Sequence, residues 1–223
     1  MFLSKIQLKR FAYKNTALLK SLSNPDGEHR ILWDFFGDKR NRERDFIYRK
    51  LLNFRSPNFV VLSERKPKNP DSRTWEVRSK LFQPKLTKEM ALQFSLRANA
   101  TIKKDGSYHD VVMNYKYELE HEKGVPRKEW PAQSVIEYEA GFEWLKKRDS
   151  KNGFQINKNA FRIQRHETIR FEKDESGRTI HLGVLDMTGL LKVLNVEKFL
   201  NTLHKGLGRS KTYGCGLMLV KLP

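Results

Sequence analysis

Apolar and polar positions in the first third of the chain follow patterns that predict one mixed α and β unit. Residues 2–8 alternate between apolar and polar side chains, which predicts a strand. A helix should begin after Asn24, a suitable cap, because Pro25 needs no N–H donor in the first turn, and Gly37 should end it. A loop or a short helix is expected at 66–74. Three further strands are predicted at residues 46–54, 58–64 and 76–82.

The same order of elements is expected again after Pro84. The strands of this second half are predicted at residues 91–103, 154–163, 168–171, 179–193 and 217–222. Amphipathic helices are predicted at 134–148 and 196–205. The first of these helices should bury Val135, Tyr138, Phe142 and Leu145. Asn195 can cap the second helix and Gly206 can end it.

Residues 104–133 are polar and rich in turn-forming residues, so this segment is expected to be mostly loop. Each half has the element order of a ferredoxin-like unit, although the two halves do not match residue by residue. The predicted fold class is therefore α+β, with two tandem ferredoxin-like (RRM-like) domains over residues 1–84 and 85–223.

Charge narrows the class of partner. The 223 residues include 44 Lys and Arg against 26 Asp and Glu, a net charge of +18. Such a chain favours a polyanionic partner, because each neutralised phosphate releases condensed counterions. The single cysteine, Cys215, excludes an internal disulfide and a thiolate metal site built from cysteines. No apolar stretch approaches the roughly 18 residues of a membrane span, so a cytoplasmic protein with no membrane partner is expected.

The segment 206–216 is the most unusual part of the chain, with four of its 13 glycines beside two cations and two hydroxyls. Glycines let the backbone approach a phosphate, and their N–H groups can form an anion-binding nest. A nucleotide-binding P-loop is excluded, because Ser210 rather than glycine precedes Lys211 and the predicted order is helix, loop, strand. A helix cap followed by a strand entry eased by glycine is the alternative interpretation.

The letters Gly-Leu-Gly-Arg-Ser-Lys-Thr-Tyr-Gly-Cys-Gly-Leu-Met-Leu (206–219) closely resemble the C-terminal signature of the CasE family. Members of this family are the repeat-processing endoribonucleases of type I-E CRISPR (Cascade) systems. Three more segments agree: Met-Phe-Leu-Ser-Lys-Ile (1–6), Asn-Pro-x-x-x-His (24–29) and Phe-Ser-Leu-Arg-Ala-Asn (94–99). The resemblance implies a tandem ferredoxin-like protein that binds the CRISPR repeat stem-loop RNA. It also implies a cut on the 3′ side of the stem without metal or cofactor, retention of the product, and assembly with the other Cascade subunits.

Cleavage of this kind uses the 2′-OH of the RNA as nucleophile and leaves a 2′,3′-cyclic phosphate and a 5′-OH. Histidine suits the proton transfers, because its ordinary pKa of about 6.5 lies near neutral pH. Among six histidines, His29 matches the catalytic histidine of the family, and it should lie at the border of the apolar stripe of its helix. Several members carry an assisting tyrosine where Asp26 stands here, so the second catalytic group stays open. Lys211 or another cation could stabilise the transition state instead.

RNA contacts are expected from two segments. One is a basic strand region that loosely matches the RNA-contacting hairpin of the family, with Arg162, Arg165 and Arg170. The other is the glycine-rich loop, with Gly208, Arg209, Ser210, Lys211, Thr212, Gly214 and Gly216. The basic runs 39–44 and 146–148 could extend the phosphate track. Two alternatives stay open: a catalytically silent repeat-RNA-binding subunit on the same scaffold, and a generic basic RNA-binding protein.

Overall fold

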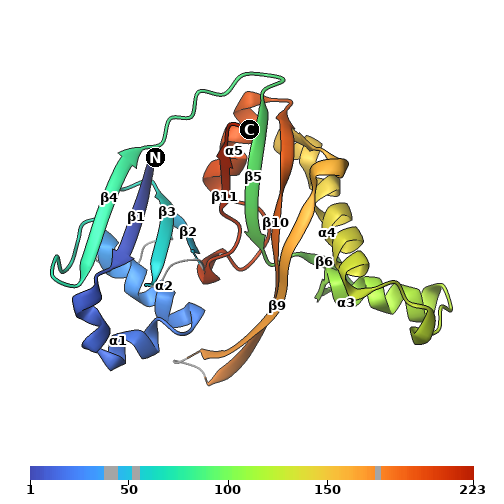
Figure 1. Ribbon diagram of the computed structural model, residues 1–223, viewed down its shortest axis with the longest axis horizontal. Helices are drawn as coiled ribbons and strands as arrows, with labels where there is room; N and C mark the ends of the chain where they lie inside the picture. Colours follow the sequence, from blue (N-terminus) through green and yellow to red (C-terminus); the bar gives the residue numbers. More distant parts are fainter. Residues whose placement is uncertain (38–44, 52–55, 174–176) are drawn as a thin grey trace. The chain divides into compact units, whose positions relative to one another are not determined.

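The computed structural model describes residues 1–37, 45–51, 56–173 and 177–223, and it forms two compact units (Figure 1). The first unit combines segments 1–85, 170–180 and 210–217. The second unit combines segments 86–169, 181–209 and 218–223. Each unit is therefore built from segments that are distant in the sequence. The independent domains 1–84 and 85–223 stay a prediction.

The first unit holds an antiparallel sheet in the order β2-β3-β1-β4. Its strands are β1 (Phe2–Leu8), β2 (Phe46–Lys50), β3 (Asn58–Ser63) and β4 (Trp75–Leu81). The first strand lies between the third and the last, as in a ferredoxin-like unit. The predicted strands are confirmed where the structure describes them; residues 52–54 of the second lie outside the described part. Residues 66–74 form a loop without a helix.

The helix α2 (Pro25–Trp33) begins as predicted. The Asn24 side chain accepts a hydrogen bond from the Gly27 N–H at 2.8 Å, and Pro25 follows the cap. A 3₁₀ turn continues the helix to Gly37, whose φ of 76° suits glycine. Leu32 of α2 joins the strand residues in one buried core. Each fully buried side chain of this size contributes about 1.5–3 kcal/mol.

Two short elements before α2 escaped the sequence prediction. They are a 3₁₀ turn, η1 (Arg10–Lys14), and α1 (Thr16–Ser21). The Asn15 side chain caps α1 by accepting the Leu18 N–H at 3.0 Å. No residue of α1 is fully buried; Leu18 and Leu19 pack against the core in part, but six residues are too few for a helical period to indicate a helix.

The second unit repeats the topology, with strand order β11-β5-β10-β8. Its strands are β5 (Ala91–Ala98), β8 (Phe154–Ile156), β10 (Arg178–Val193) and β11 (Met218–Lys221), and its longer helices are α4 (Gln133–Asp149) and α5 (Val196–Lys205). Again the first strand lies between the third and the last. The Asn195 side chain caps α5 through the Lys198 N–H at 2.9 Å. The prediction of an α+β protein with two tandem ferredoxin-like folds is confirmed.

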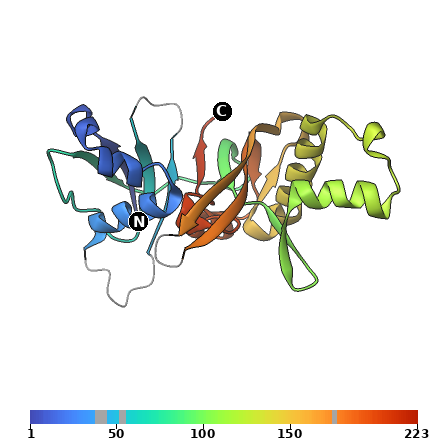
Figure 2. The ribbon, with the colours of Figure 1, turned by 90° about the horizontal axis from the view of Figure 1, so that it is seen from below.

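The expectation of a loop at 104–133 is wrong. This segment completes a hairpin of β6 (Thr101–Lys104) and β7 (Ser107–Asp110), then forms α3 (Val111–Tyr117), a π turn, η3 (Glu118–Glu122), and a 3₁₀ turn, η4 (Arg127–Glu129) (Figure 2). Asp105 and Gly106 make the hairpin turn with positive φ. The Asp110 side chain caps α3. Val111 and Val112 of α3 are buried, but Met113 and Tyr117 are largely exposed, so apolar residues lie on both faces of the helix and obscure its period.

Two further details of the second unit correct the sequence prediction. The strand predicted at 154–163 ends at Ile156, because Asn157 caps a 3₁₀ turn, η6 (Lys158–Ala160). The next strand, β9 (Arg162–Lys173), is continuous and pairs with β10. Val135 is 46% exposed, and Ile136 is buried in its place. The basic run 39–44 lies outside the described residues, and no helix in the described part is long and apolar enough to cross a membrane.

Candidate active site

His29 lies half-buried on α2, at the border of its apolar face as the periodicity predicts. The indole N–H of Trp33, one turn later, donates a hydrogen bond to His29 Nε2 at 3.1 Å. The ring of Phe46 lies 5.9 Å from the imidazole, centroid to centroid. Because Nε2 accepts this bond, a neutral imidazole in this arrangement carries its proton on Nδ1. Trp33 and Phe46 therefore fix the orientation of the imidazole.

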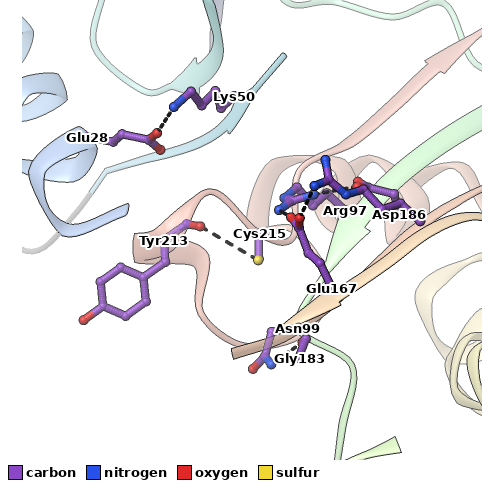
Figure 3. A network of polar contacts seen from close by, with 10 residues as sticks. Glu28, Lys50, Arg97, Asn99, Glu167, Gly183, Asp186, Tyr213 and Cys215 are labelled. Carbon is purple, nitrogen blue, oxygen red and sulfur yellow. Dashed lines mark hydrogen bonds and ion pairs between the residues drawn. The ribbon is translucent and has the colours of Figure 1, made fainter. Parts of the chain in front are cut away.

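Contacts with β2 hold the start of α2 in place. The Lys50 ammonium donates to Glu28 Oε1 at 2.5 Å and to the Leu22 carbonyl oxygen at 2.9 Å (Figure 3). Tyr48, whose ring is fully buried, donates its hydroxyl hydrogen to the Pro25 carbonyl oxygen at 3.2 Å. The first turn of the helix, which precedes His29, is thus attached to the sheet by side chains of one strand.

Gly27 is required for the approach of α1 to α2. A Cβ added there would lie 2.0 Å from the Ser21 carbonyl oxygen, so a methyl group must push the two helices apart. We expect Gly27→Ala to lower the free energy of unfolding by about 1–3 kcal/mol, measured by chemical denaturation. The exposed Lys147→Ala on α4 is the control and should change it by less than about 0.5 kcal/mol. If Gly27→Ala has the same free energy of unfolding as the wild type, α1 can shift away from α2 without loss of stability.

The loop 210–217 packs against the same helix. Its 3₁₀ turn, η7 (Lys211–Tyr213), contacts both α2 and β2. Gly214 ends the turn with a φ of 75°, and a Cβ there would lie 3.2 Å from the Tyr48 ring. The unit that carries His29 therefore also contains five of the predicted loop residues: Ser210, Lys211, Thr212, Gly214 and Gly216. Tertiary packing brings these segments together from opposite ends of the chain.

Tyr213 is the residue of this loop that sequence reasoning passed over, because it lacks charge. Its ring meets the Phe171 ring in a T-shaped contact, 4.9 Å between centroids. Burial raises the pKa of the Tyr213 phenol, the negative charge of Asp26 raises it further, and the positive charge of Arg178 lowers it. The phenol is therefore protonated at neutral pH. Within the described part of the chain, its hydroxyl has no hydrogen-bond partner.

Four of the predicted RNA-contacting residues belong to the second unit, and Arg170 belongs to the first. The Arg209 guanidinium lies 3.5 Å from the centroid of the Tyr108 ring, and Gly208 packs beside Asn99 and Trp144. Arg162 donates to the carbonyl oxygens of Asn159 and Phe161, at 2.8 and 2.7 Å. Arg165 pairs with Glu167 at 2.6 Å. Arg162 and Arg165 of β9 thus already have protein partners.

The segment Phe-Ser-Leu-Arg-Ala-Asn (94–99) carries a structural network in the second unit (Figure 3). Arg97, 7% exposed, pairs with Asp186 at 2.5 Å and also with Glu167. The Asn99 amide donates to the Gly183 carbonyl oxygen at 2.8 Å. These bonds join β5 to β9 and β10, so the segment holds the sheet together. No group of three His, Cys, Asp or Glu side chains in the described ranges is arranged to hold a metal ion.

Two ferredoxin-like folds, with a histidine held on a helix beside a basic glycine-rich loop, define a tandem ferredoxin-like protein with a candidate acid–base site. The family model described as CRISPR associated protein matches residues 1–221. The chain belongs to this family. No curated protein sequence matches it.

Solved structures of CRISPR proteins share the fold. The CRISPR endoribonuclease Cse3 bound to a 19-nucleotide RNA is 24% identical, with a TM-score of 0.73 over 99% of this chain and 100% of that one. The Escherichia coli K-12 Cas6e is 18% identical over the whole of both chains, with a TM-score of 0.56. A chain of a CRISPR RNA-guided surveillance complex is 17% identical over the whole of both chains, with a TM-score of 0.63. At these identities the matches establish the fold.

Proposed function

We propose that this protein is an endoribonuclease that binds the CRISPR repeat stem-loop and cleaves precursor CRISPR RNA at the 3′ side of the stem. The observation that carries the proposal is the placement of His29, oriented by Trp33 and lying on the helix against which loop 210–217 packs. Membership of the CRISPR-associated family supports an RNA of this kind as substrate. The fold shared with an endoribonuclease solved with RNA supports the cleavage.

The proposed reaction needs no group beyond the RNA and the protein. The 2′-oxygen attacks the adjacent phosphorus and loses its proton, while the P–O5′ bond breaks and O5′ takes up a proton. The products are a 2′,3′-cyclic phosphate and a 5′-OH. His29 performs one of the two proton transfers, which its imidazole can do near neutral pH. The Lys211 ammonium stabilises the negative charge on phosphorus.

RNA binding in this proposal uses both units. Arg170 and the loop residues Ser210, Lys211, Thr212, Gly214 and Gly216 contact phosphates from the first unit. Arg162, Arg165, Gly208 and Arg209 do so from the second. A-form RNA hides its bases in a narrow major groove, so these contacts read shape and phosphates. The protein keeps the cleaved RNA, acts in the cytoplasm and assembles with the other type I-E Cascade subunits; the shared fold of a surveillance-complex chain supports this assembly.

The test is incubation of the purified protein with a repeat stem-loop RNA in excess EDTA. One cut at the 3′ side of the stem, ending in a cyclic phosphate, is the expected result, read by gel mobility and mass spectrometry. Cleavage that requires added Mg²⁺ would contradict the metal-independent mechanism. Equal affinity for unrelated RNAs, with a steep salt dependence, would instead indicate a generic basic RNA-binding protein.

A second candidate is a silent subunit that binds the repeat RNA without cutting it. The observation that favours it is Asp26, a carboxylate on the turn before His29 that pairs with Arg30 at 3.7 Å and is not a phenolic acid. Tight and specific binding of the stem-loop with no product, after long incubation with and without Mg²⁺, would select this candidate.

A further inference from the structure

Tyr213 is attached to the first turn of α2 through a short series of contacts. Its turn, η7, packs on α2 and β2, and Gly214 brings the backbone so close to the Tyr48 ring that an added Cβ would lie 3.2 Å from it. The Tyr48 hydroxyl in turn binds the Pro25 carbonyl oxygen. The position of the Tyr213 backbone relative to the helix of His29 is therefore fixed by buried groups of the first unit.

The Tyr213 ring is held as well, and its hydroxyl is not used by the fold. Phe171 packs on the ring at an interplanar angle of 70°. In the part of the chain that the structure describes, the hydroxyl makes no hydrogen bond. The hydroxyl is not among the buried polar atoms that lack a partner in the described residues, so solvent or a ligand can reach it. An oriented donor without a protein partner is suited to a ligand.

The charges around Tyr213 indicate which ligand it suits. Burial and, after it, the negative charge of Asp26 raise the pKa of the phenol and favour its neutral form, so the hydroxyl is a hydrogen-bond donor and is not poised to remove a proton. Arg178, whose positive charge also acts on the phenol, adds attraction for an anion. A neutral hydrogen-bond donor next to a positive charge suits a negatively charged oxygen, such as a non-bridging oxygen of a phosphate diester.

Resting on the proposed function, we propose that Tyr213 is a catalytic residue of the cleavage. Its hydroxyl donates a hydrogen bond to a non-bridging oxygen of the scissile phosphate, where negative charge increases as the 2′-oxygen adds to phosphorus. Tyr213 gives up no proton in this step. The 2′-OH proton leaves and O5′ is protonated through His29 and solvent, so the atoms balance as before.

The test compares wild type, Tyr213→Phe and Tyr13→Phe under single-turnover conditions with saturating protein. Tyr213→Phe keeps the ring on Phe171 and removes only the hydroxyl, so the melting temperature and the RNA Kd should stay the same. Its cleavage rate constant should fall about 10²- to 10³-fold, by analogy with the loss of one donor to a developing oxyanion. Tyr13→Phe, in the same unit, should cleave like wild type.

A second measurement separates this role from a structural one. Replacing one non-bridging oxygen of the scissile phosphate by sulfur should slow cleavage by the wild type for one diastereomer. The same replacement should slow cleavage by Tyr213→Phe markedly less, because that variant already lacks the hydrogen bond that the sulfur weakens. Wild-type cleavage with an unchanged Tyr213→Phe rate would overturn this inference alone. A wild-type protein that binds the stem-loop and never cleaves it would overturn the proposed function, and this inference with it.

Discussion

Replacing His29 by alanine should slow RNA cleavage by about 10²- to 10⁴-fold, the range of a lost acid–base group. RNA affinity should stay within about twofold, because the imidazole is half-buried against Trp33 and Phe46 and adds little to the phosphate-binding surface. The loss of the hydrogen bond from Trp33 should cost only about 0.5–1.5 kcal/mol of stability. Single-turnover cleavage, filter binding and thermal melting of the same preparations measure the three quantities.

The matched control is His121→Ala, which removes a 55% exposed histidine from the second unit and should leave cleavage unchanged. Trp33→Phe is informative as well, because it keeps His29 and removes the N–H that orients it, so an intermediate loss of rate is expected. If His29→Ala still cleaves at more than about a tenth of the wild-type rate, the proton transfers belong to another residue.

Replacing Arg97 by methionine should destabilise the second unit by about 3–5 kcal/mol, the usual cost of removing one partner of a buried ion pair. Arg97 and Asp186 are only 7% and 6% exposed, and Glu167 shares the same guanidinium. Methionine fills part of the volume, so the loss of stability comes mainly from the buried Asp186, which loses the Arg97 guanidinium, whereas Glu167 keeps its pair with Arg165. Urea denaturation, followed by a probe in the second unit, measures the change.

Two variants make this prediction specific. Arg127→Met removes an exposed pair with Glu120 and should leave the stability of the second unit almost unchanged. Arg97→Met combined with Asp186→Leu should recover part of the stability, because the buried carboxylate that had faced Arg97 is then gone. If Arg97→Met is as stable as Arg127→Met, the network formed by the segment 94–99 is not needed for the fold, and its role must lie elsewhere.

Features of the fold with a local cause were predictable from the sequence. Asn24 and Asn195 mark helix starts, because the cap and the N–H groups that it accepts are neighbours in the chain. Strands with one buried face were also predicted, because the alternation of apolar and polar residues reflects the burial of that face. The helix α3 was missed because the exposed Met113 and Tyr117 obscure the period of the buried Val111 and Val112, and α1 because six residues are too few to show a period.

The candidate site also has features that the sequence predicts and features that depend on tertiary packing. The sequence by itself determined that His29 would lie at the edge of an apolar helix face, since a helical period places it there. It also supplied the glycines of the loop 206–216. Only the tertiary structure decided that Gly214 meets Tyr48 and that the phenol of Tyr213 is influenced by the charge of Asp26. Contacts of that kind depend on how sheet and helix pack, which local propensity does not encode.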